Sequence, residues 1–146
     1  MRREFPAGGV AIRRLRGEWV FAAIRPGGKK PGVWALPKGL IDESETPDAT
    51  ALRETEEETG IQARLVTKLG DIRYVYTWEG ERVFKVVSFY LLRYSKGRLG
   101  ELEPEMRIEV DEARWLPLAD APRLLSYGGE REIAEKALAF VRDNGL

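Results

Sequence analysis

The stretch RETEEETG, residues 53–60, concentrates negative charge within a short part of the chain. On an α-helix, Glu54, Glu57 and Glu58 would share one face at positions i, i+3 and i+4, whereas Glu56 would point away. Like charges at this spacing repel by roughly 0.2 to 0.5 kcal/mol per pair, so a compensating partner is expected. A solvated acidic face with basic neighbours is one interpretation. A site for Mg²⁺ or Mn²⁺ is the other, because hard divalent cations prefer converging carboxylate oxygens.

The composition limits the chemistry that is available. The sequence contains no cysteine and no histidine, which excludes disulfides as well as thiolate and imidazole metal ligands. Any metal must therefore be bound by oxygen, and any general base must be a carboxylate, Tyr, Lys or metal-bound hydroxide. Lys plus Arg and Asp plus Glu both number 24, and this balance predicts neither a nucleic-acid partner nor an acidic membrane partner.

Length and hydropathy predict one domain, residues 1–146, located in the cytoplasm. A chain of 146 residues, 43% of them hydrophobic, can bury one sizeable core but is short for two domains. The opening MRREFPAGG lacks the apolar segment of a signal peptide, and no stretch approaches the ~20 apolar residues that span a bilayer. Monomer and homodimer are both compatible with this pattern.

The acidic cluster requires a helix to position it, and the sequence predicts one over residues 47–59. The Thr46 hydroxyl can cap free N–H groups, and Pro47 suits the first helical position. Gly60 suits the residue that ends a helix.

The remaining elements predict a mixed α/β domain around this helix. Strands are expected over residues 9–15, 19–24, 65–78, 82–94 and 113–118. Short turns at Arg16-Gly17 and Glu79-Gly80 are expected to join the first and second pairs into hairpins. The run FKVVSFYLL is apolar enough for a strand buried on both faces. A last helix over residues 130–143 has an apolar stripe typical of core packing.

The acidic helix belongs to a longer pattern of fixed spacings. The pattern runs Gly39, five residues, Glu45, seven residues, Arg53-Glu54-Thr55, one residue, Glu57-Glu58, one residue, Gly60-Ile61. It resembles the signature box of the Nudix hydrolases over its whole span, and the flanking segments resemble Nudix domains in the same order. Thr55 departs from the family pattern, which usually has an aliphatic residue there, and this affects local packing only.

The resemblance implies an α/β (α+β) Nudix fold, a mixed β-sheet sandwiched between α-helices. It also implies an enzyme, a phosphoric anhydride hydrolase that uses Mg²⁺ or Mn²⁺ to cleave a nucleoside diphosphate linked to another group. Arg53 and Glu45 are expected to orient the loop and the helix through an ion pair. Gly39 is expected to let the backbone turn tightly beside the metal. The carboxylates expected to bind the metal are Glu54, Glu57 and Glu58.

Many family members add a carboxylate from outside the box, as a metal ligand or as the base. Glu109, in IEVDEARW, matches this position best. It is also interpretable as one charge of a solvated acidic loop. The neighbouring alternatives are Glu103, Glu105 and Glu112.

Two lysines are candidates for phosphate contacts in such a reaction. A metal that bridges phosphate oxygens lowers the pKa of a bound water, so a carboxylate can complete its deprotonation without histidine, and water then attacks phosphorus. Lys38, in WALPKG beside the box, is the first candidate, and Lys85, in the strand over residues 82–94, is the second. Either ammonium could instead be solvated.

Aromatic residues are candidates for binding a nucleobase. If the hairpin turns at Glu79-Gly80, Tyr74, Tyr76 and Trp78 share one face, and Lys85 lies across from Tyr74. Stacking on a base is worth about 1 to 3 kcal/mol per ring, although cross-strand core packing is the alternative. Tyr127 is a further stacking candidate by the resemblance, with capping of the last helix as its alternative.

Several functions remain compatible with these residues. The flanking motifs look most like the dinucleoside polyphosphate (Ap4A-type) branch, so a dinucleoside polyphosphate hydrolase is the main prediction, with a nucleotide as its small-molecule partner. The alternatives are a MutT-like pyrophosphatase of (oxidised) nucleoside triphosphates, an ADP-ribose hydrolase and a diphosphoinositol polyphosphate hydrolase. A non-catalytic nucleotide sensor would usually lack box carboxylates, which this chain keeps. A calcium-binding regulator would require a D-x-D-x-D-G loop, which is absent.

Overall fold

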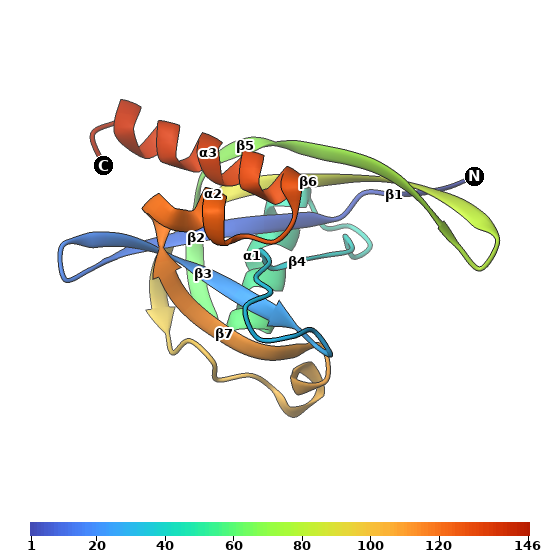
Figure 1. The fold of residues 1–146 in the computed structure, drawn as a ribbon, viewed down its shortest axis with the longest axis horizontal. Coiled ribbons are helices and arrows are strands. Elements are labelled where there is room, and N and C mark those ends of the chain that lie inside the picture. Colours follow the sequence, from blue (N-terminus) through green and yellow to red (C-terminus); the bar gives the residue numbers. More distant parts are fainter.

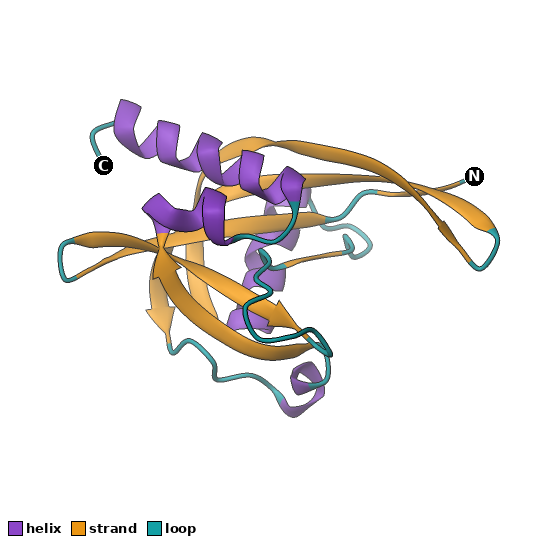
Figure 2. Ribbon diagram, in the orientation of Figure 1, coloured by secondary structure: helices purple, strands orange, loops and turns teal.

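A twisted mixed sheet lies between two helical layers in the computed structural model, which describes residues 1–146 (Figures 1 and 2). Helix α1 (Pro47–Thr59) covers one face, and α2 (Ala121–Leu124) and α3 (Gly128–Asp143) cover the other. The predicted α+β architecture, a mixed sheet between helices, is therefore confirmed. No helix combines the length and the apolar character that crossing a membrane requires.

The sheet has the strand order β1-β6-β2-β3-β7, with β5 paired to β6 and β4 paired to β2. Strand β6 runs parallel to β1 and β2, and all other pairs are antiparallel. The strands are β1 (Arg2–Glu4), β2 (Ala7–Leu15), β3 (Glu18–Pro26), β4 (Lys38–Gly39), β5 (Ile61–Trp78), β6 (Glu81–Gly97) and β7 (Val110–Pro117). Two short 3-10 turns, η1 (Pro104–Arg107) and η2 (Leu118–Asp120), complete the order.

Both predicted hairpins are present. Arg16 and Gly17 have φ angles of 52° and 79°, and Glu79 and Gly80 have φ angles of 48° and 78°. Two consecutive positive φ values characterise the two-residue turns whose twist matches that of the flanking strands. The turn at Glu79-Gly80 fixes the register of β5 on β6, so the residue pair predicted across this hairpin can be tested directly.

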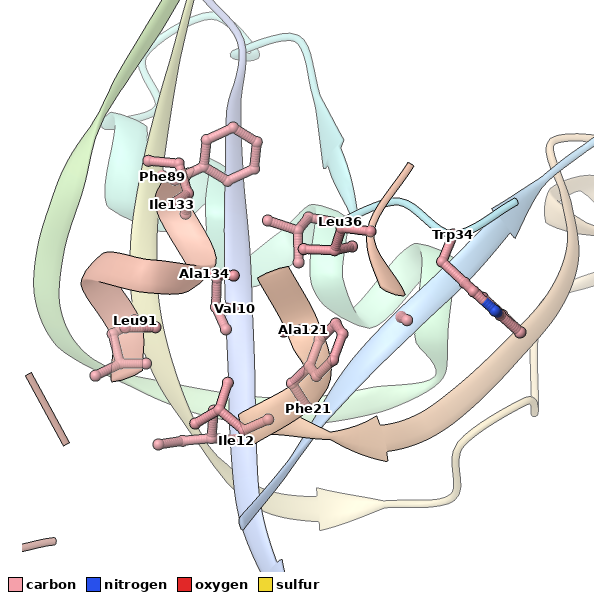
Figure 3. Packing of buried hydrophobic residues seen from close by; sticks show 14 of the residues in the cluster. Val10, Ile12, Phe21, Trp34, Leu36, Phe89, Leu91, Ala121, Ile133 and Ala134 are labelled. Atoms are coloured by element: carbon pink, nitrogen blue, oxygen red, sulfur yellow. The ribbon is translucent and has the colours of Figure 1, made fainter. Parts of the chain in front are cut away.

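The main core lies between the sheet and α3, and a smaller one lies between the sheet and α1. Val10 and Ile12 of β2 point into the main core with Phe21, Phe89 and Leu91, whereas the intervening Ala11 belongs to the smaller one (Figure 3). This alternation follows from the two-residue period of a strand. On α3, the predicted apolar stripe is confirmed by Ile133, Ala137 and Val141, which are buried in the main core.

The boundaries of α1 agree with the sequence prediction, but its N-terminal cap differs. Pro47 occupies the first turn, and Gly60, with a φ of 87°, donates its N–H to the carbonyl of Glu56. The predicted cap by the Thr46 hydroxyl is wrong, because Thr46 makes no side-chain capping bond. The Thr46 side chain instead lowers the pKa of Asp48.

The strands are longer than predicted, and one burial prediction is wrong. Pairing between β5 and β6 continues to Ile61 and Gly97, and α3 begins at Gly128. Within FKVVSFYLL, Val87, Phe89 and Leu91 are buried in the main core and Leu92 is buried in the smaller one, but Ser88 and Tyr90 are only partly buried. Toward its turn, the β5–β6 hairpin projects beyond the helical layers (Figure 1).

Replacing Thr55 by valine tests the packing between α1 and the sheet. Thr55 is fully buried, and its hydroxyl has no hydrogen-bond partner. A valine of nearly the same shape removes this unpaired polar group, so Thr55→Val should raise the free energy of unfolding by about 1 to 2 kcal/mol. The matched control is Thr50→Val, which removes a hydroxyl that donates to Glu45 Oε1 at 2.6 Å and should destabilise the protein. Urea denaturation measures both, and a destabilised Thr55→Val would contradict the packing described.

Candidate active site

Two glutamates of α1 lie buried against β4. Glu54 and Glu58, one helical turn apart, are each 8% exposed. The backbone N–H of Lys38 donates to Glu58 Oε1 at 3.3 Å. At Gly39, a Cβ atom would lie 2.2 Å from the carboxylate of Glu54. The expectation that Gly39 serves a tight turn is therefore wrong, because its φ is not positive and the glycine instead leaves room for the Glu54 carboxylate.

The electrostatics of this pair favour a cation. Burial raises the pKa of Glu58, and the adjacent charge of Glu54 raises it further. Burial also raises the pKa of Glu54, against the opposing effect of Arg53. Two buried carboxylates in contact cannot both ionise at low cost unless positive charge is supplied.

Arg53 connects the loop before α1 to the acidic face of the helix. Its guanidinium donates to both oxygens of Glu45, at 2.8 and 3.0 Å, which is the predicted ion pair in bidentate form. It also donates to Glu54 at 2.9 Å and to Glu57 at 3.2 Å, and to the carbonyl of Leu40 at 3.0 Å. Through these bonds one side chain orders the loop and orients the acidic face.

The third predicted metal ligand, Glu57, is less buried than Glu54 and Glu58. Glu57 is bonded to Arg53 through both carboxylate oxygens and is more exposed than Glu54 and Glu58. No group of three acidic side chains converges as a metal site in the structure. Glu54 and Glu58 still form an oxygen-only, negatively charged pair that fits a hard divalent cation. They would hold the ion, and participation of Glu57 stays a prediction.

The predicted carboxylate from outside the box lies in the short connection between η1 and β7. Glu109 is exposed and follows η1, where its carbonyl accepts the N–H of Gly27 at 2.8 Å. Its side chain makes no hydrogen bond or ion pair, so its proposed participation stays a prediction. Among the alternatives, Glu103 and Glu105 are also exposed, whereas Glu112 binds Arg25 at 3.5 Å.

Lys38 lies beside the buried pair, as predicted, but its ammonium has a protein partner that the sequence did not suggest. Its Nζ donates to Glu130 Oε2 at 2.9 Å and to the carbonyl of Leu36 at 3.3 Å. Burial opposes the charge of Lys38, but Glu130 outweighs this effect and the pKa of Lys38 is raised. Sequence reasoning missed Glu130. The available signal was its place on the buried stripe of α3, three residues before Ile133, where a charge is unusual.

Two aromatic cavities meet at Lys38 and Tyr74. The larger cavity, of about 680 Å³, is bordered by Tyr127 and by the first turn of α3. The smaller cavity, of about 400 Å³, is bordered by Tyr76 and Lys85. Lys38 and Tyr74 border both, so a molecule in one cavity can extend past the lysine into the other.

The aromatic residues have the arrangement predicted from the hairpin register. Tyr74 pairs with Lys85 across β5 and β6, and the rings of Tyr74 and Tyr76 are 6.1 Å apart. Lys85 Nζ lies 5.1 Å from the Tyr76 ring and 3.6 Å from Glu4. Tyr74 and Trp78 are exposed, so the alternative of core packing does not apply to them.

Tyr127 precedes α3 and is 41% exposed at the wall of the larger cavity. Its side chain makes no capping bond to the helix, although its carbonyl accepts the N–H of Arg131 at 3.0 Å. The capping alternative for this side chain is therefore wrong, and the ring is free to contact a ligand.

Comparisons with known proteins agree with this geometry. The family model of the NUDIX domain matches residues 3–137. The Mycobacterium tuberculosis protein named as mutator protein MutT4 is 42% identical over 105 residues, which cover 72% of this chain and 41% of that protein. The RNA pyrophosphohydrolase of Erythrobacter litoralis is 30% identical over 129 residues, covering 80% of this chain and 78% of that protein. The chain spans between 29% and 43% of the length of three curated relatives that it matches.

A solved structure of a C. elegans Ap4A hydrolase binary complex is similar over nearly the whole chain. Its TM-score is 0.72 at 26% identity, with 96% of this chain and 98% of that one covered. The likeness therefore includes the sheet, both helical layers and the segment that carries the acidic pair.

Replacing Glu45 by glutamine tests the Arg53 network through its pH dependence. Hydrogen bonds from Arg53 and then from Thr50 lower the pKa of Glu45 from 4.5 to about 2. Because the pKa is lower in the folded than in the unfolded chain, this carboxylate stabilises the fold above about pH 4.5, and the contribution is lost as the pH falls toward 2. Glu45→Gln should therefore melt below the unaltered protein at pH 7, and the difference in Tm should shrink between pH 4.5 and 2.

Circular dichroism at a series of pH values measures this difference. The control is Glu43→Gln, which changes an exposed glutamate of the same loop and should leave Tm unchanged. A Tm difference for Glu45→Gln that stays constant across the pH range would contradict the proposed ion-pair network.

Proposed function

This chain belongs to the Nudix family, and on that premise we propose that it is a Mg²⁺-dependent pyrophosphohydrolase that cleaves dinucleoside polyphosphates. The observation that carries this proposal is the pair of aromatic cavities that meet at Lys38, beside Glu54 and Glu58. A dinucleoside polyphosphate has one base at each end of an anionic chain. Two cavities with a cation and a metal-binding pair between them match that outline. The similarity to a C. elegans Ap4A hydrolase supports the same substrate class.

Tyrosines are assigned to the two bases, and lysines are assigned to the phosphates between them. In this proposal Tyr127 contacts one base in the larger cavity and Tyr76 contacts the other in the smaller cavity. Stacking of a base on an aromatic ring contributes about 1 to 3 kcal/mol, enough to hold each end. Lys38 and Lys85 bind phosphate oxygens between them, and Tyr74 separates the two cavities.

The chemistry of cleavage is assigned to the acidic face of α1. Glu54 and Glu58 would hold Mg²⁺, with Glu57 close by. When bound, Mg²⁺ would supply Lewis-acid chemistry that withdraws charge from phosphate and acidifies water. Water attacks phosphorus, and a carboxylate accepts its proton because the chain has no histidine. Lys38 offsets the charge that develops on the phosphate oxygens as the nucleotide leaves.

A MutT-like pyrophosphatase acting on nucleoside triphosphates is the second candidate. It is favoured by the similarity to MutT4 and by the size of the larger cavity, which would hold a single nucleoside without help from the smaller one. ADP-ribose and diphosphoinositol polyphosphates remain further candidates for the same reaction. A cytoplasmic location, the absence of a nucleic-acid partner, and a monomeric or homodimeric state stay predictions.

The metal proposal predicts an asymmetric effect of two substitutions on α1. Glu58→Gln removes a proposed ligand and should lower kcat at saturating Mg²⁺ by at least about 100-fold, without loss of stability, because it also removes a buried charge. Glu56→Gln is the matched control, since Glu56 is exposed and bonded to Gln62. Near-normal turnover of Glu58→Gln would remove this residue from the metal site. Ca²⁺ should bind to the unaltered protein but support little turnover.

The substrate proposal predicts that a substitution in either cavity raises the KM for a dinucleoside polyphosphate. With a dinucleoside tetraphosphate, Tyr127→Ala and Tyr76→Ala should each raise KM by about 5- to 150-fold and change kcat less. With a nucleoside triphosphate, only one of these variants should matter. Steady-state kinetics on Ap4A, 8-oxo-dGTP, ADP-ribose and a diphosphoinositol phosphate compares the classes. If a nucleoside triphosphate has the highest kcat/KM and depends on one cavity, the MutT-like alternative is correct.

A further inference from the structure

The segment over residues 34–38 is held on both sides, although only part of it is a strand. On the sheet side, Ala35 exchanges two backbone hydrogen bonds with Ile24, at 2.8 and 2.9 Å, and the carbonyl of Pro37 accepts the N–H of Gly9 at 3.1 Å. On the other side no strand is present. The side chains of Trp34 and Leu36 enter the main core (Figure 3), whereas the intervening Ala35 does not. Side chains therefore alternate between two faces, as in an extended strand.

Side chains before and in the first turn of α3 replace the missing strand. The Trp34 N–H donates to the hydroxyl of Ser126 at 3.0 Å, and the Trp34 carbonyl accepts the Ser126 N–H at 3.0 Å. Two residues on, the Leu36 N–H donates to Glu130 Oε1 at 2.7 Å. The N–H groups of Trp34 and Leu36 thus both have acceptors.

Glu130 also binds the side chain of the next residue in this alternation. Its second oxygen, Oε2, accepts from Lys38 Nζ at 2.9 Å. Glu130 is 4% exposed, and a carboxylate so deeply buried is stable only when it is paired and fully hydrogen-bonded. Its place in the first turn of α3 adds a favourable interaction with the helix N-terminus.

This pairing determines where Lys38 points. An ammonium has three N–H donors, and in Lys38 two of them bind Glu130 and the carbonyl of Leu36. The third has no protein partner, and Lys38 borders both aromatic cavities. The backbone N–H of the same residue binds Glu58 of the acidic pair. One glutamate outside the signature box therefore fixes the direction of the lysine that lies between the cavities and the acidic pair.

We propose that Glu130 is a positioning residue of this active site, which acts through Lys38 and does not touch the substrate. It holds the backbone at Leu36 with one oxygen and directs the Lys38 ammonium toward the phosphate chain with the other. The proposal rests on the proposed polyphosphate cleavage for its kinetic consequences. Its structural part is that the two oxygens of Glu130 bind the Leu36 N–H and the Lys38 ammonium, and this part does not depend on the substrate.

Substitution of Glu130 by glutamine or alanine distinguishes its hydrogen bond to the Leu36 N–H from its bond to the Lys38 ammonium. In Glu130→Gln, the remaining carbonyl oxygen can still accept the buried Leu36 N–H, but the amide NH₂ cannot accept from the ammonium. In Glu130→Ala both acceptors are lost. The matched controls are Glu135→Gln, an exposed unpaired glutamate of the same helix, and Ser126→Ala, which removes the hydroxyl acceptor of the Trp34 N–H alone.

NMR of the protein without substrate tests the structural part. In Glu130→Ala, hydrogen exchange at the Leu36 amide should be faster by about tenfold or more, while the Ala35 amide, bonded to β3, stays protected. In Glu130→Gln the Leu36 amide should stay protected, but the Lys38 side chain, followed through its labelled Cε, should become more mobile. Ser126→Ala should affect the Trp34 amide only. Unchanged Lys38 mobility in Glu130→Gln would overturn the proposal, even if Glu130→Ala fails to fold.

Kinetics with a dinucleoside tetraphosphate and Mg²⁺ test the functional part. Glu130→Gln should raise KM by about tenfold with a smaller change in kcat, whereas Glu135→Gln should change neither. In the double variant with Lys38→Met, the substitution at Glu130 should add nothing to the effect of Lys38→Met alone, because both act on the same ammonium. Additive effects would show that Glu130 acts only on overall stability and would overturn the proposal. If the unaltered protein cleaves no dinucleoside polyphosphate, the proposed function fails, while the NMR outcome still decides on Glu130.

Discussion

The burial of two adjacent carboxylates, Glu54 and Glu58, is the constraint on which the surroundings of α1 depend. Taking two like charges out of water is unfavourable by several kcal/mol unless positive charge and hydrogen-bond donors are supplied. Neighbouring residues supply part of this charge and some of these donors. Arg53 binds Glu54, and the backbone N–H of Lys38 binds Glu58. Gly39 contributes by lacking a side chain, since any Cβ there would overlap the Glu54 carboxylate. The compensation is incomplete, which is the physical reason that the pair suits a metal ion.

The segment over residues 34–39 connects the acidic pair to the sheet and to α3. It pairs with the sheet through Ala35 and β4, with α3 through Glu130, and with α1 through Glu58. Both helical layers therefore contact one short stretch of backbone, which also forms a wall of each cavity. Because this stretch is tied from three directions, the lysine that it carries occupies a defined position between the acidic pair and the aromatic residues.

Local sequence signals predicted much of the fold because each depends on near neighbours. The helix over residues 47–59 followed from Pro47 and Gly60, and both hairpins followed from turns in which two successive residues adopt positive φ. The alternation of Tyr74, Tyr76 and Trp78 opposite Lys85 followed from the turn position, which sets the register of the whole hairpin. Strand ends and the burial of β6 were less predictable, since they depend on where α1 and α3 stop covering the sheet.

The sequence by itself determined the acidic face of α1, because residues three and four positions apart on a helix share one face whatever the rest of the protein does. Its fixed spacings also indicated the family and, through the resemblance, the Arg53–Glu45 pair. Only the tertiary structure decided that Glu54 and Glu58 are buried while Glu57 is more exposed, and that the Glu109 side chain is exposed before β7. It also decided that Glu130, 92 residues after Lys38, is the partner of that lysine. Such contacts depend on how the helices and the sheet pack against one another, and local residue spacing does not predict that packing.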